Sequence, residues 1–284
     1  MFVGEKSPEP HFKPATVQSS LAVMAFFSSK EADVHQRNFE VVIYEEDYKQ
    51  LCAWVLMKTN IETGGDLFGL WAEKRTAVIQ FVVGPGQNCR RSSVSFYQDI
   101  SYLEEIGSQM TKSEGVCHIG EWHSHHQLGL ARPSGGDENT VWNNMPTYNL
   151  KRFVIFIANL EQSEKDSYSV NIGCFLFELE SVNGNEKRLP VSQGTFKILQ
   201  KENPLNGKLL EKRNEGAEYD DKEVEMKDLK LEISDDGPPR VTYVESSPLT
   251  KRKRRHHEGR SASSGDESVD EMIEPNRKKR SSRK

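Results

Sequence analysis

The sequence has few cysteines and no long apolar run. The cysteines show no Cys-x-x-Cys spacing and stand at positions 52, 89, 117 and 174. This pattern suits a reducing compartment and argues against a dense disulfide framework. The apolar stretch Leu21 to Phe27 is far shorter than the roughly 20 residues that cross a bilayer. The first residues also lack the basic-then-apolar pattern of a signal peptide. We therefore expect a soluble intracellular protein with no membrane contact.

Several familiar catalytic motifs are also missing. The chain contains no His-Glu-x-x-His helix, no Walker-type phosphate loop and no Gly-x-Ser-x-Gly elbow. A zinc deaminase would need a Pro-Cys-x-x-Cys segment, which is absent. Cys117 beside His118 offers only sequence adjacency, which is insufficient for a cysteine protease. These absences exclude the commonest zinc-helix, nucleotide-binding and serine-hydrolase classes.

The distribution of apolar residues predicts one globular domain between two polar ends. Apolar residues are concentrated between about Phe39 and Leu199. We expect a mostly disordered segment at 1–37, a folded domain at 38–202 and a disordered charged tail at 203–284. Within the tail, only a short helix near residues 224–231 is predicted.

Hydrophobic periodicity predicts the element order β-α-β-β-α-β-α-β-β within the domain. The expected strands are 39–44, 67–71, 76–83, 116–125, 153–158 and 170–179, and the expected helices are 45–58, 98–110 and a short one that begins near residue 134 and is broken by Pro146. Residues 188–199 fit either a further strand or a terminal helix. This order predicts an α/β fold, with a mixed sheet and helices on both faces.

Two histidines and an aspartate form a candidate metal site. His123 and His125 are two apart on a predicted strand, so they share one face while Ser124 points away. Ser134-Gly-Gly-Asp137 has the form of a helix start, with a serine cap and an aspartate in the first turn. Zinc held by two imidazoles and one carboxylate keeps a position open, as catalytic sites do. Glu62, before a glycine pair at the head of a strand, is a candidate base.

These segments together resemble a known motif. Glu62-Thr-Gly-Gly, His123-Ser-His125 and Ser134-Gly-Gly-Asp137 are similar to the JAMM motif of the JAB/MPN zinc metalloproteases, a deubiquitinase family, and in particular to prokaryotic-type JAB domains. The resemblance covers roughly residues 39–199. It implies a mixed, curved β-sheet flanked by helices, related to the cytidine deaminases. It further implies Zn²⁺ ligation by His123, His125 and Asp137, a general-base role for Glu62 toward zinc-bound water, and oxyanion stabilisation by Ser134.

The chain departs from the family pattern in the loop between ligands. Residues 126–133 are one residue longer than the usual spacing, and His126 replaces a proline that often follows the second histidine. We expect the extra residue to bulge the loop at Gly129 and His126 to lie at the rim of the site. By strand parity, Trp122 should enter the core, whereas Glu121 could hydrogen-bond a ligand imidazole. His118 has no assigned partner and is expected to be structural.

The resemblance predicts a zinc-dependent isopeptidase that hydrolyses the bond between ubiquitin, or a ubiquitin-like modifier, and its target. The alternative is a non-catalytic MPN-type module that recognises a ubiquitin-like protein or scaffolds a complex. The resemblance leaves open the modifier, the chain linkage and the need for a partner subunit. The loops 87–96 and 143–151 are the candidates for substrate choice.

The predicted tail carries two compact basic blocks, Lys251 to Arg255 and Arg277 to Arg280. Blocks of this kind are typical of nuclear import signals or nucleic-acid contacts. We expect nuclear localisation through importin recognition, with direct nucleic-acid binding by the tail as a further hypothesis, which strong salt dependence would favour.

Overall fold

The computed structural model describes residues 39–126, 129–164, 167–206, 224–234 and 237–245. Most of the described strands belong to a single 11-stranded mixed sheet. The basic blocks and the segment 1–37, for which disorder was predicted, lie outside the described residues.

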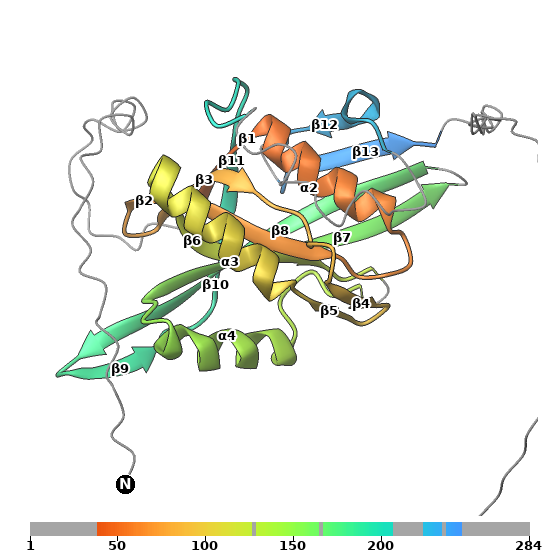
Figure 1. The fold of residues 1–284 in the computed structure, drawn as a ribbon. Helices are drawn as coiled ribbons and strands as arrows, with labels where there is room; N and C mark the ends of the chain where they lie inside the picture. Colours follow the sequence, from red (N-terminus) through yellow and green to blue (C-terminus); the bar gives the residue numbers. More distant parts are fainter. Residues whose placement is uncertain (1–38, 127–128, 165–166, 207–223, 235–236, 246–284) are drawn as a thin grey trace, which may run out of the picture. The chain divides into compact units, whose positions relative to one another are not determined.

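The large sheet follows the order β11-β1-β3-β2-β6-β7-β8-β13-β12, with β9 and β10 also paired to β8 (Figure 1). The strands are β1 Glu40–Tyr44, β2 Gly64–Glu73, β3 Thr76–Val82, β6 Cys117–Ser124, β7 Arg152–Glu164, β8 Ser167–Val182, β9 Asn185–Arg188, β10 Ser192–Gln193, β11 Thr195–Leu199, β12 Lys230–Glu232 and β13 Arg240–Val244. Three pairs, β1 with β11, β1 with β3 and β6 with β7, are parallel, and the other pairs are antiparallel. A separate hairpin consists of β4 Arg90–Ser92 and β5 Ser95–Tyr97. The fold is thus mixed α/β with a curled mixed sheet, as predicted.

Helix α2 Glu45–Met57 supplies the main apolar cluster on one side of the sheet. Its buried side chains pack against strand residues on one face of the sheet, such as Leu67 and Phe156. Trp54 of α2 stacks on Trp122 of β6 with ring centroids 5.5 Å apart. Burying a large aromatic pair contributes several kcal/mol, at roughly 25 cal/mol per Å² of apolar surface. This stack therefore fixes β6 from the face opposite to its histidines.

Two further helices cover the face of the sheet opposite to α2. Helix α3 Ile100–Gln109 continues into a π-helical turn, Met110–Glu114, and packs on Phe68 and Phe81. Helix α4 Gly135–Thr147 packs on β7 and β8 through Trp142 and its neighbours. The predicted arrangement, with helices on both faces, is therefore found. None of the helices in the described ranges is long and apolar enough to cross a bilayer.

The prediction that α4 ends at about Pro146 is confirmed, because the helix ends at Thr147, one residue later. A proline within a helix leaves the carbonyl four residues earlier without its usual donor, and that carbonyl belongs to Trp142. Here the guanidinium of Arg188 donates to Trp142 O at 3.4 Å and lies 5.5 Å from the Trp142 ring. A residue far along the chain thus compensates for the proline.

The predicted disorder beyond residue 202 is wrong for the described segments of that region. Strand β13 pairs with β8 and β12 pairs with β13, so both extend the sheet. Val241 and Tyr243 enter the main cluster, and the hydroxyl of Tyr48 donates to Pro239 O at 2.6 Å. The expected helix near 224–231 is reduced to a 3₁₀ turn, Met226–Asp228, followed by a strand. Residues 188–199 form strands, which settles the alternative left open above.

Because β13 is part of the folded core, we predict that Val241→Ala lowers the free energy of unfolding by about 2 kcal/mol. Val241 is fully buried, whereas Val244 on the same strand is 66% exposed. Val244→Ala is therefore the matched control and should change stability little. Urea unfolding followed by circular dichroism measures both, and equal effects would show that β13 does not belong to the cooperative core.

Candidate metal centre

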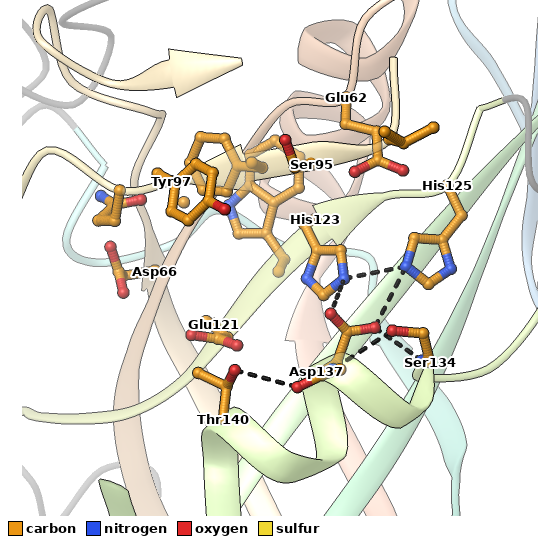
Figure 2. Close-up of a pocket in the computed structure, with 16 residues that line it drawn as sticks. Glu62, Asp66, Ser95, Tyr97, Glu121, His123, His125, Ser134, Asp137 and Thr140 are labelled. Atoms are coloured by element: carbon orange, nitrogen blue, oxygen red, sulfur yellow. Dashed lines mark hydrogen bonds and ion pairs between the residues drawn. The ribbon is translucent and has the colours of Figure 1, made fainter. Parts of the chain in front are cut away.

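Strand β6 carries both histidines to one place. It is paired with β2 on one side and β7 on the other, and His123 stands opposite Gly64 and Ile157. The two Nε2 atoms, of His123 and His125, are 3.1 Å apart, and both residues are buried. Figure 2 shows the two imidazoles side by side on the same face. The prediction that His123 and His125 lie on the same face of their strand is confirmed.

The start of α4 brings the aspartate to these imidazoles. Ser134 is the N-cap: its Oγ accepts from the Asp137 amide at 3.2 Å, and its own amide donates to Asp137 Oδ2 at 2.7 Å. Asp137 Oδ1 lies 3.5 Å from His123 Nε2, and Oδ2 lies 3.4 Å from His125 Nε2. The ligand atoms of the three residues all lie within 4.8 Å of one another, so the cluster could bind a metal ion.

The longer loop between the ligands does not separate them. Gly129 has a φ of +59°, in the left-handed region that glycine adopts readily. The Nδ1 atom of His125 donates to Leu130 O at 3.1 Å. This bond fixes the imidazole so that its Nε2 faces Asp137, which is the usual way in which a second hydrogen bond orients a metal-ligating histidine.

The charges at the cluster stabilise one another. Burial alone would raise the pKa of Asp137, but hydrogen bonds from His123, His125 and Ser134 outweigh it and hold the pKa well below its usual value. Burial disfavours the charged form of His125, but hydrogen bonds with Asp137 and Leu130 raise its pKa above the usual value. Asp137 is therefore ionised near neutral pH, as a metal-binding carboxylate must be.

Glu62 faces the imidazoles from the opposite side to Asp137 (Figure 2). Only 3% of the residue is exposed, and its Oε1 has no hydrogen-bond partner among the residues described. Burial raises the pKa of its carboxyl group, and the nearby histidines partly oppose this shift. A buried carboxylate oxygen without a partner is costly. The site therefore has an acceptor that is free to act on a bound molecule.

Ser124 contributes to the site although the sequence prediction only had it point away from the ligands. Its amide donates to Thr63 O at 2.9 Å, and its Oγ accepts from the Thr63 amide at 3.0 Å. Thr63 directly follows Glu62, so Ser124 ties the segment that carries Glu62 to the histidine strand. In the sequence, the only indication of this role was that Ser124 lies between His123 and His125, with its side chain on the opposite face of the strand.

A cavity of about 440 Å³ is lined by all five candidate residues, Glu62, His123, His125, Ser134 and Asp137. The β4–β5 hairpin supplies another wall, through residues 94–97. The amide of Glu62 donates to Ser92 O of this hairpin at 2.8 Å. The hairpin lies in and beside loop 87–96, one of the two loops predicted to govern substrate choice. In the sequence, only the location of the hairpin within this polar loop indicated that it lies at the site.

Of the predictions for residues next to the cluster, some are confirmed and others are wrong. Trp122 is 1% exposed and belongs to the core, as predicted. The placement of His126 at the rim is wrong, because its Nε2 contacts Val55 O of α2 at 3.2 Å and the residue does not line the cavity. Glu121 lines the cavity, but within the described part of the chain it makes no hydrogen bond to either ligand imidazole. His118 is half-buried against Asp66, at 3.0 Å.

Fold and site together define a mixed α/β protein with a curled sheet and a His-His-Asp cluster that could bind a metal ion. No family model matches the chain. Over 84 residues it is 32% identical to "Probable metalloprotease y4qB" of Sinorhizobium fredii, a match that covers 29% of this chain and 51% of that protein. The chain thus spans about half the length of this relative. The solution structure of protein DSY2949 from Desulfitobacterium hafniense matches with 17% identity and a TM-score of 0.41, over 57% of this chain and 94% of that one.

We predict that the purified chain binds a divalent metal ion and that His125→Ala weakens the affinity by more than about 100-fold. Even indirect partners of metal ligands contribute roughly 10- to 100-fold, so loss of a ligand costs more. His118→Ala, on the same strand but outside the cluster, should retain the metal. Metal content after dialysis and isothermal titration measure both, and unchanged affinity in His125→Ala would rule out this cluster.

Gly65 has no room for a side chain. A Cβ there would lie 2.0 Å from Val83 O and 2.8 Å from Gly84 O, both backbone atoms. We predict that Gly65→Ala destabilises the fold by about 1–3 kcal/mol, since overpacked sites force the backbone to shift. Gly135→Ala is the control, because nothing lies within 4 Å of a Cβ at that position. Comparable melting temperatures for the two variants would contradict this steric account.

Proposed function

We propose that the chain is a JAMM-type zinc metalloprotease that hydrolyses the peptide or isopeptide bond joining ubiquitin, or a ubiquitin-like modifier, to its target. The observation that carries this proposal is the convergence of His123, His125 and Asp137 opposite a buried glutamate, Glu62, in one cavity. The order and spacing of these residues along the chain agree with the JAMM pattern, apart from the one-residue longer loop.

The compactness and the donor set of the cluster support zinc. The Nε2 atoms of His123 and His125 lie 3.1 Å apart. Asp137 Oδ1 lies 3.5 Å from His123 Nε2, and Asp137 Oδ2 lies 3.4 Å from His125 Nε2. Two imidazoles and one carboxylate are also a donor set that zinc takes in catalytic sites. A zinc ion held by them would act as a Lewis acid and lower the pKa of water toward neutrality.

The chain's own residues then supply the proton transfer. Glu62 accepts the proton of the attacking water, because its carboxylate faces the cluster and its Oε1 is not engaged by the described residues. The same carboxyl group delivers that proton to the leaving amine, as general acid–base catalysis requires. Its burial raises the pKa toward the working pH, which makes both transfers easier.

Ser134 is suited to stabilise the oxyanion of the tetrahedral intermediate. Its Oγ accepts from the Asp137 amide, so the hydroxyl hydrogen remains available for donation into the cavity that Ser134 lines. Capping α4 and donating to an oxyanion are therefore compatible roles. A well-placed donor of this kind contributes about 10²–10³ in rate.

The similarity to a relative named a probable metalloprotease supports a hydrolase, over the 84 matched residues only. The alternative function is a non-catalytic module that binds a ubiquitin-like protein. Such a module has no need of a buried carboxylate without a hydrogen-bond partner, so Glu62 favours the enzyme. Nuclear import through the basic blocks remains a proposal about residues outside the described ranges.

The test is cleavage of a panel of ubiquitin chains and ubiquitin-like fusions, with and without a metal chelator. We predict that Glu62→Gln retains the metal content of the parent chain and lowers kcat by about 10²–10⁴, the usual contribution of a general base. Glu202→Gln, a matched change at an exposed position, should leave kcat unchanged. Full activity in Glu62→Gln, or cleavage that resists the chelator, would contradict the proposal.

A further inference from the structure

A polar cavity of about 590 Å³ lies on the other side of the loop that follows the second histidine. Gly129 and Ala131 line this polar cavity, whereas His125 and Ser134, at the two ends of the same loop, line the cavity of the metal cluster. The two cavities have no lining residue in common. Residues 129–131 therefore form a wall between them, and the carbonyl of Leu130 in this wall accepts from His125 Nδ1.

The floor of the polar cavity is a row of side chains on three neighbouring strands. Asn159 of β7 stands opposite Asn171 of β8, which stands opposite Arg240 of β13. Ala158 and Val241, the next residues on two of these strands, enter the main apolar cluster under α2. Because side chains alternate along a strand, the row lies on the other face of the sheet, which also carries the metal cluster.

The row begins one strand away from the metal ligands. The amide of His125 donates to Ala158 O at 2.9 Å, and Asn159 is the next residue of β7. Neighbouring strands are about 4.8 Å apart, so the row extends for about 10 Å from Asn159 to Arg240. Three residues of an extended chain have the same length, at about 3.3 Å per residue. A polypeptide held at the metal can therefore continue along this row.

The two asparagines offer hydrogen-bonding groups to a ligand. Asn159 Oδ1 is buried and has no hydrogen-bond partner among the described residues, which is costly unless a ligand supplies a donor. Asn171 Oδ1 accepts from Arg240 Nε at 3.0 Å, a bond that leaves the two N–H donors of the Asn171 side chain. A carboxamide matches the N–H and C=O groups of a peptide bond, whatever side chains the peptide carries.

The charges around the row disfavour an anionic ligand. The charged residues that line the polar cavity are Glu161, Glu232 and Arg240. Arg240 Nη2 already lies 3.7 Å from Glu161 Oε2. A free carboxylate or a phosphate would meet an excess of negative charge, whereas an uncharged peptide main chain would not.

We propose that the polar cavity binds the main chain of the target polypeptide beside the modified lysine, through the side-chain amides of Asn159 and Asn171. The inference rests on the proposed isopeptidase function. A modifier ends at the scissile carbonyl, but the target chain continues in both directions from its lysine and needs a floor that crosses several strands. The far part of this floor, Arg240 on β13, lies outside residues 39–199, the span that resembles the JAMM family.

The test uses the full chain and two capped pentapeptides. The first is acetyl-Ala-Ala-Lys(acetyl)-Ala-Ala amide, whose acetyllysine carries a minimal isopeptide bond. In the second, lactic acid replaces the alanine on each side of the lysine, so an ester oxygen takes the place of two main-chain N–H donors. We expect the all-amide peptide to bind about tenfold more tightly, the scale of one or two hydrogen bonds. In two-dimensional ¹⁵N NMR it should shift the side-chain NH₂ signals of Asn159 and Asn171.

Variants identify the polar cavity. Asn159→Ala and Asn171→Asp should each reduce the preference for the all-amide peptide to less than about twofold. Asn171→Asp keeps an acceptor for Arg240 Nε, so this variant retains the contact between β8 and β13. Asn185→Ala, at an exposed position of β9, is the control and should keep the full preference. Melting temperatures from circular dichroism establish that each variant is folded.

Equal binding of the two peptides by the parent chain would overturn the proposal, as would a full preference in both cavity variants. Neither peptide carries a modifier, so binding is measured apart from cleavage of a conjugate. A preference for the all-amide peptide in a chain that cleaves no conjugate would contradict only the hydrolase. Cleavage of conjugates by a chain without this preference would contradict only the present inference.

Discussion

The site depends on the pairing of β2 with β6. That register sets Gly64 opposite His123 and Asp66 opposite Glu121, and it brings Glu62, just before β2, to the end of β6 that carries the histidines. A slip of one residue would turn every one of these side chains to the other face of the sheet. Two features hold the register. Gly65 lets the backbones of β2, Val83 and Gly84 approach closely, and Ser124 closes a pair of hydrogen bonds with Thr63 just beyond the last strand pair.

Concentrating histidines and carboxyl groups on one face of buried strands is costly, because each charged group loses water on folding. The opposite face of the same strands offsets this cost. Leu67 and Trp122 alternate with Asp66 and His123, and they enter the main apolar cluster under α2. The Trp54–Trp122 stack and the hydrogen bond from Trp122 Nε1 to Val83 O at 3.0 Å hold β6 in place from the face that packs against α2. The polar face is thus positioned by the packing of the apolar one.

The parts of this site that the sequence predicted are those set by local periodicity. His123 and His125 follow from a period of two, and the Ser134–Asp137 cap follows from helix-start chemistry. The parts that it missed depend on distant partners. The bulge at Ile119, which turns His118 toward the site, is visible only in the pairing with β2. Arg188 donates to Trp142 O, the carbonyl that Pro146 leaves without its helical donor, across 46 residues of sequence. The strands beyond residue 202 have too few apolar residues to stand out from the charged composition around them.

The hydrogen bond between Glu62 and the β4–β5 hairpin joins the buried carboxylate to another wall of the cavity. The hairpin contributes Phe96 and Tyr97 to the cavity wall, and its Ser92 carbonyl accepts from the Glu62 amide. On the other side, Thr63 is fixed to Ser124 between the two histidines. Glu62 is therefore held between a wall that a substrate would contact and the strand that carries the ligands. A change in the hairpin can therefore shift the Glu62 carboxylate through the bond between the Glu62 amide and Ser92 O.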